Sequence, residues 1–91
     1  MDKLTSMNVF VKAAELGSFA AAAEALNMSP QMVAKNVAWL ETRLGTRLLN
    51  RTTRRQSLTE IGHSYLSKCK TVLAEVEEAD AIALQMKLSP A

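Results

Sequence analysis

The chain has 91 residues, of which 48% are hydrophobic and 22% charged, so it has the composition of one small folded domain rather than of a disordered chain. No apolar run reaches the length of a membrane span, and the first residues lack the apolar core of a signal peptide. One cysteine and one histidine argue against a disulfide or a zinc site. We therefore expect a cytoplasmic protein with no membrane contact, metal or cofactor.

The formal net charge of +2 is unevenly distributed. Residues 35–55 hold six lysines and arginines against one acid, Glu41, whereas residues 75–80 form an acidic block. This pattern favours one surface that meets a polyanion and another that stays away from it. A charged run is equally typical of a merely solvated surface, so charge alone does not decide.

Two helices are predicted before residue 27. The first covers residues 2–16, begins with Asp2 as its cap and ends at Gly17. Ser18 caps the second helix, residues 19–26, which is almost entirely alanine and so allows another helix to approach closely. The exposed N–H groups at its start favour anions, so Ser18 is expected either to contact a phosphate or to be a cap only.

The stretch from Ser29 to Gly45 predicts a complete helix. Ser29 is a good cap, Pro30 suits the first helical position, and Gly45 suits a left-handed end. Apolar residues at spacings of four, three and four define a buried face. Opposite this face lie residues 31, 32, 35 and 36, where glutamine, lysine and asparagine are suited to reading base edges. A short helix, a turn of residues 27–29 and this helix have the layout of a helix-turn-helix.

Residues 46–58 predict a small β-hairpin, or wing, with a polar tip. Arginine at the tip is suited to a narrow minor groove, where negative potential is concentrated. The alternative is a solvated, charged loop.

Thr59 starts a last helix that extends to about Lys87, spanning roughly 40 Å at 1.5 Å per residue. Its apolar residues repeat at spacings of four and three, which is a heptad pattern. Because the preceding part is too small to cover that length, a second chain is expected to cover it. The residues expected in this dimer interface are Tyr65, Cys69, Val72, Leu73, Val76, Ala79, Ala83 and Met86.

Residues 18–62 resemble the N-terminal winged helix-turn-helix of the LysR-type transcriptional regulators. The resemblance is carried by Ser18-Phe19, Ala21-Ala22-Ala23-Glu24-Ala25-Leu26, Ser29, Val33, Leu40-Glu41, Leu44-Gly45, Arg47-Leu48-Leu49, Arg51-Thr52-Thr53-Arg54-Arg55 and Leu58-Thr59-Glu60-Ile61-Gly62. Motifs in this order are seldom found outside that family. The fold expected from them is mainly α, a winged helix-turn-helix over residues 1–58 followed by a linker helix for dimerisation over residues 59–91.

The resemblance implies a bacterial transcription regulator, not an enzyme, that binds double-stranded DNA at an interrupted dyad as a homodimer. Its linker helices would pair antiparallel, and a C-terminal domain absent from this chain would bind a small effector. By position, residues 30, 31, 32, 34 and 35 match the family's major-groove residues, and Arg54 matches the residue that enters the minor groove. The residues expected to contact DNA are Ser18, Ser29, Pro30, Gln31, Met32, Ala34, Lys35, Asn36, Arg51, Thr53, Arg54 and Arg55.

This chain has Ala34-Lys35 where family members often have Ser-Arg, so a hydroxyl is absent and a guanidinium fork is replaced by a point charge. The second-ranked function is a helical dimerisation or protein-docking module whose arginines are solvated. An enzyme ranks third, because the chain has no nucleophile–base pair, glycine-rich phosphate loop or paired carboxylates.

Overall fold

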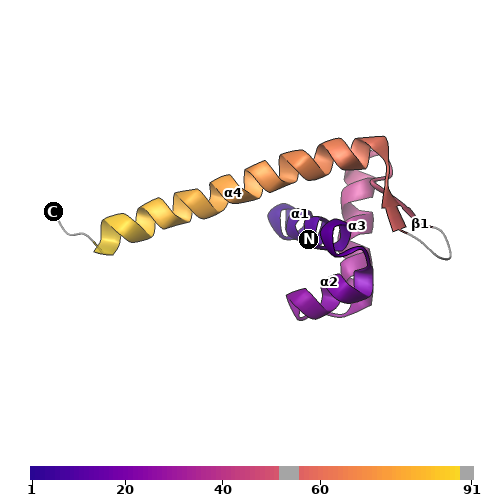
Figure 1. The fold of residues 1–91 in the computed structure, drawn as a ribbon, viewed down its shortest axis with the longest axis horizontal. Coiled ribbons are helices and arrows are strands. Elements are labelled where there is room, and N and C mark those ends of the chain that lie inside the picture. Colours follow the sequence, from indigo (N-terminus) through magenta and orange to yellow (C-terminus); the bar gives the residue numbers. More distant parts are fainter. Residues whose placement is uncertain (52–55, 89–91) are drawn as a thin grey trace.

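The computed structural model describes residues 1–51 and 56–88, which form helices and one antiparallel hairpin (Figure 1). In chain order the elements are α1 (Lys3–Leu16), α2 (Phe19–Leu26), α3 (Pro30–Leu44), β1 (Leu49–Arg51), β2 (Gln56–Leu58) and α4 (Glu60–Leu88). The hairpin register pairs Leu49 with Leu58 and Arg51 with Gln56. The predicted fold, a mainly helical winged helix-turn-helix followed by a long helix, is confirmed.

The helix ends follow the predicted caps. Asp2 accepts hydrogen bonds from the hydroxyl of Thr5 at 2.6 Å and from its backbone N–H at 2.9 Å. These bonds hold the pKa of the Asp2 carboxyl below its usual value, because they stabilise its charged form. At the other end Gly17 adopts a left-handed conformation with φ of 83°, which glycine reaches without the penalty that a Cβ would bring.

The hydrophobic core lies on two sides of α1, which crosses between the other helices. On one side, residues from α1, α3, α4 and the start of the hairpin pack together: Met7, Phe10, Val11, Val37, Leu40, Leu48, Leu49 and Cys69. On the other side α1 packs against the helix-turn-helix through Val9, Ala13, Ala22, Ala23 and Val33. Both helices of the helix-turn-helix are therefore fixed to α1 by buried apolar contacts.

The first turns of α4 belong to this core. Cys69 is 0% exposed, and the Tyr65 ring lies 5.8 Å from that of Phe10. Val72 and Leu73 are partly buried against the same cluster. The prediction that Cys69 lies between two chains is wrong, because the head of its own chain covers it completely. The other three also pack on that head, so they do not form a purely intermolecular seam. Burial raises the pKa of the Cys69 thiol, which keeps it protonated at neutral pH.

Beyond this junction α4 extends away from the head, as Figure 1 shows. The molecule measures 57 × 25 × 21 Å along its principal axes. Residues 74–88 are all exposed, including the predicted interface residues Val76, Ala79, Ala83 and Met86. The core extends across residue 58, and the division into residues 1–58 and 59–91 stays a prediction. None of the helices in residues 1–51 and 56–88 combines the length and the apolar composition that a membrane crossing needs.

Candidate nucleic-acid interface

The turn between α2 and α3 is closed by backbone hydrogen bonds. Asn27 adopts a left-handed conformation with φ of 55°, and the N–H of Met28 donates to the carbonyl of Ala23 at 3.0 Å. Asparagine tolerates this conformation better than most residues. Because Ala22 and Ala23 are small and buried, α3 lies close to α2 and its N-terminus faces outward.

The N-terminal turns of α3 present an exposed polar surface. Pro30, Gln31 and Lys35 are exposed, Met32 is 42% exposed, and Ala34 is partly buried. This surface lies opposite the buried residues of the helix, as the amphipathic pattern predicts. The residues expected to face the major groove are therefore accessible together, with the exception of Asn36.

The exception is Asn36. The prediction that its side chain faces outward and reads a base is wrong. Asn36 is only 5% exposed, and its Oδ1 accepts a 2.7 Å hydrogen bond from the hydroxyl of Ser6, which is 0% exposed. Its Nδ2 donates to the carbonyl of Met32 at 2.9 Å. A buried amide and a buried hydroxyl are satisfied by each other, so the side chain fixes α3 to α1 and does not reach outward.

Ser18 and Ser29 are confirmed as helix caps. The Ser18 hydroxyl accepts from the N–H of Ala21 at 3.0 Å, and the Ser29 hydroxyl accepts from that of Met32 at 3.1 Å. Each cap satisfies one backbone donor at its helix start, and donors that a helix start leaves without an intrahelical partner can bind an anion. Their contact with phosphates stays a prediction.

The hairpin carries Arg51 at the end of β1. Its guanidinium lies 3.4 Å from Glu41 and 5.0 Å from the centre of the Phe19 ring. Arg51, predicted to contact DNA, therefore has intramolecular partners on α3 and α2, and its contact with DNA stays a prediction. The predicted DNA contacts Thr53, Arg54 and Arg55 lie outside the described residues.

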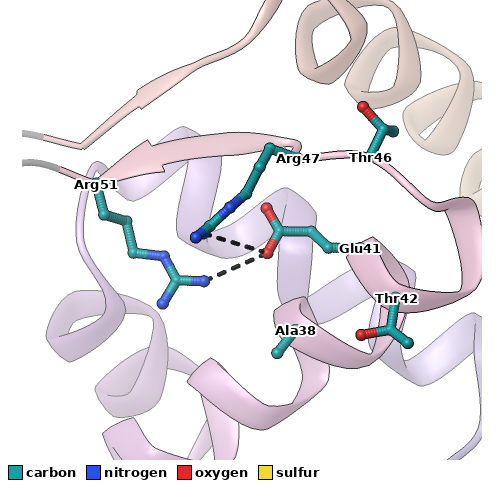
Figure 2. Close-up of a pocket in the computed structure, with 6 residues that line it drawn as sticks. All are labelled: Ala38, Glu41, Thr42, Thr46, Arg47 and Arg51. Carbon is teal, nitrogen blue, oxygen red and sulfur yellow. Dashed lines mark hydrogen bonds and ion pairs between the residues drawn. The ribbon is translucent and has the colours of Figure 1, made fainter.

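Glu41 is the centre of this region and was not predicted as a functional residue (Figure 2). Its carboxylate accepts hydrogen bonds from the backbone N–H groups of Leu48 at 2.8 Å and Leu49 at 3.2 Å. Arg51 and Arg47 lie 3.4 and 4.0 Å from its other oxygen. Glu41 is only 9% exposed. A charge that is buried to this extent requires partners of this kind.

The junction between β2 and α4 depends on a close approach at Gly62. The Thr59 hydroxyl accepts from the Gly62 N–H at 2.9 Å, and the Thr59 N–H donates to the Leu48 carbonyl at 3.0 Å. A Cβ on Gly62 would lie 2.1 Å from that carbonyl oxygen. Only glycine fits at this position. Because the Thr59 hydroxyl caps the N–H of the residue three positions later, the threonine and the glycine occur at this spacing.

An exposed recognition helix after a tight turn, with a two-stranded wing beside it, defines a winged helix-turn-helix, a class of DNA-binding fold. Residues 4–63 match the model of the lysR family of bacterial regulatory helix-turn-helix proteins. The chain belongs to that family.

Similar proteins are themselves regulators. An HTH-type transcriptional repressor from Pseudomonas aeruginosa is 49% identical over 81 residues, which cover 89% of this chain and 26% of the relative. The HTH-type transcriptional activator AaeR from Escherichia coli is 45% identical over 78 residues, covering 86% of this chain and 25% of the relative. The chain thus spans about a quarter of the length of these relatives, whose names describe regulators rather than enzymes.

A solved structure shows the same fold together with DNA. The crystal structure of BenM_DBD in complex with catB site 1 DNA has a TM-score of 0.93 and 25% identity, and covers 100% of each chain. The match extends over α4 as well as the head, so the long helix is part of the shared fold.

Proposed function

We propose that this chain binds duplex DNA as a homodimer at an interrupted dyad and thereby regulates transcription. In each protomer the N-terminus of α3 enters the major groove and the wing contacts the adjacent minor groove. The observation that carries this proposal is the exposed N-terminal surface of α3, held outward by its buried packing on α1 and α2.

Gln31 and Lys35 are the base-reading residues in this proposal. They lie four residues apart on one helix and so on one side of it, and both are exposed. The amide of glutamine matches the N6 and N7 of adenine, and the lysine ammonium matches the acceptors of guanine. Pro30, Met32 and Ala34 would supply apolar contacts beside them, and Ser18 and Ser29 would contact phosphates.

The wing contributes through charge. Arg54 matches the family's minor-groove residue, and Thr53 and Arg55 flank it in sequence. A cation in a narrow groove reads groove width and therefore favours A/T-rich flanks. We assign Arg51 mainly to holding the wing in place, because its guanidinium already has partners in the protein.

The exposed part of α4 supplies the dimer contact. Val76, Ala79, Ala83 and Met86 continue the heptad spacing along a segment that the head does not cover. A groove of about 300 Å³ lies where this segment leaves the head, with Leu4 of α1 and Leu73 and Val76 of α4 in its walls. Two antiparallel copies of α4 would bury these apolar side chains and set the distance between the recognition helices.

The remainder of the regulator belongs to the same proposal. Because the relatives extend well beyond the matched segment, we propose that a C-terminal domain outside this chain binds a small effector. The two relatives named above are a repressor and an activator. We place the regulator in the cytoplasm, where bacterial promoters are.

Alanine at Gln31 tests the assignment of base reading. Gln31→Ala is expected to weaken binding by roughly 1–3 kcal/mol and to relax the preference at one base pair, because a bidentate contact is lost. Binding isotherms on duplexes that vary one base pair at a time would measure both effects.

Asn36→Ala is the matched control, because the side chain is on the same helix but buried. Losing its bond to Ser6 should lower the free energy of unfolding by about 1–3 kcal/mol and leave the base preference unchanged. Equal weakening of every sequence by Gln31→Ala would make Gln31 a backbone contact. Relaxed preference in Asn36→Ala alone would contradict the assignment altogether.

A further inference from the structure

We propose that Glu41 is the positioning residue of the wing: its buried carboxylate fixes the hairpin to the recognition helix and so couples minor-groove to major-groove contact. This inference rests on the proposed function, because it requires the wing to contact DNA. It assigns a role in recognition to a residue that itself lies behind the DNA-binding surface.

The first step is the way Glu41 holds the start of the wing. One oxygen of its carboxylate accepts the N–H groups of both Leu48 and Leu49, where the chain turns from α3 into β1. The carbonyl of Leu48 in turn accepts the N–H of Thr59, just after β2. The base of the hairpin is thus bonded to α3 on one side and to the start of α4 on the other.

Farther along the hairpin, Glu41 also holds the end of β1. The other oxygen of Glu41 pairs with Arg51, whose guanidinium also lies over the Phe19 ring of α2. Arg51 is the register partner of Gln56, and the Gln56 side-chain amide donates to the Ala13 carbonyl at 3.0 Å. Both strands are therefore attached to helices at this level, and the attachment that Glu41 supplies joins β1 to α3.

The surroundings of the Glu41–Arg51 ion pair indicate that it positions the wing rather than only stabilising the fold. The ion pair borders an open hollow of about 490 Å³ rather than a packed core, and the Arg51 side chain is 37% exposed (Figure 2). Neutralising Glu41 therefore removes no buried apolar contact. Glutamine has the same shape and keeps a carbonyl oxygen for the Leu48 and Leu49 N–H groups, but it lacks the charge that holds Arg51. Glu41→Gln should loosen the wing on a folded head.

The test compares binding to two duplexes that share the same half-sites but have A/T-rich or G/C-rich flanks. The wild-type chain should prefer the A/T-rich duplex, and Arg54→Ala should remove that preference. Glu41→Gln should reduce the flank preference at least threefold, while the base preference at the pair read by Gln31 stays as in the wild type. A residue needed only for folding would lower both preferences together.

Arg47→Gln is the matched control. Arg47 lies 4.0 Å from the same carboxylate but its side chain is 67% exposed, so its loss should leave the flank preference unchanged. Arg51→Gln removes the other end of the ion pair and should reproduce the effect of Glu41→Gln, which keeps the test valid if the latter fails to fold. The fluorescence of Trp39, the single tryptophan, reports folding because the residue packs against the core.

The outcomes distinguish a failure of the positioning role of Glu41 from a failure of the proposed minor-groove contact. If Arg54→Ala removes the flank preference but Glu41→Gln and Arg51→Gln keep it, the positioning role is overturned and the proposed function stands. If the wild type shows no flank preference, or Arg54→Ala retains it, the minor-groove part of the proposed function fails and the positioning role fails with it.

Discussion

Replacement of Gly62 by alanine is expected to lower the Tm of the chain by about 10 °C or more. The added Cβ would lie 2.1 Å from the Leu48 carbonyl oxygen and 3.1 Å from the Thr59 hydroxyl oxygen. Backbone must move to relieve this overlap, and the movement breaks the hydrogen bonds that join the wing to α4. Overpacking of this kind costs about 3 kcal/mol or more, and a domain of this size loses roughly 4–8 °C per kcal/mol.

The sign of this effect is informative, because alanine is about 1 kcal/mol better than glycine inside a helix. Without the close approach, Gly62→Ala would stabilise α4. Gly17→Ala is the control: its φ is 83° but nothing lies within 4 Å of the added Cβ, so only backbone strain of about 1 kcal/mol is expected. Thermal unfolding at one protein concentration compares them, and a Gly62→Ala chain as stable as Gly17→Ala would contradict the structure at this junction.

A glutamate at Val76 should abolish the dimer and leave the head folded. Val76 is 38% exposed and borders the groove between α1 and α4. In the proposed antiparallel pair it lies in the buried apolar stripe, so each chain would bury a charge without a partner, at a cost of several kcal/mol. DNA affinity should then fall by about 100-fold or more, because the two heads no longer bind as one unit.

Ala74→Glu places the same charge on the opposite side of α4, two residues away and also exposed. It should remain a dimer with normal affinity. Sedimentation velocity gives the oligomeric state, and circular dichroism checks that the helices persist. A helical, dimeric Val76→Glu protein would show that the dimer contact lies elsewhere, as would an equal loss in Ala74→Glu.

Local chemistry in the sequence was sufficient to predict the recognition helix. Ser29, Pro30 and Gly45 each have a reason to stand at a helix end, and α3 extends from Pro30 to Leu44 between them. The direction of Asn36 could not be predicted in the same way. Its partner Ser6 is thirty residues away in the chain, and a polar residue next to the apolar stripe faces outward unless a distant polar group meets it.

The heptad pattern of α4 predicted a long apolar stripe but not what covers each part of it. Spacing is the same whether a residue packs on its own head or on a second chain. Cys69 proved to be part of the head, whereas residues 74–88 are all exposed. The length of the helix was therefore predictable, and the point at which the exposed stripe begins was not.

Glu41 shows why the centre of the wing junction was missed. In the sequence it is one acid among arginines, and two of its partners are backbone N–H groups that any residue would supply. Side-chain patterns carry no signal for such a contact. Only the turn after Gly45, which brings Leu48 and Leu49 back against α3, makes the carboxylate necessary.

Hydroxyl-radical footprinting of the chain on duplexes selected from random DNA tests the central claim most directly. The proposed homodimer predicts two protected half-sites related by a dyad and separated by about one helical turn or more. Weaker protection should lie in the minor groove outside each half-site, where the wings would contact DNA. A single protected half-site without a symmetric partner would contradict the dimeric reading of DNA on which the account depends.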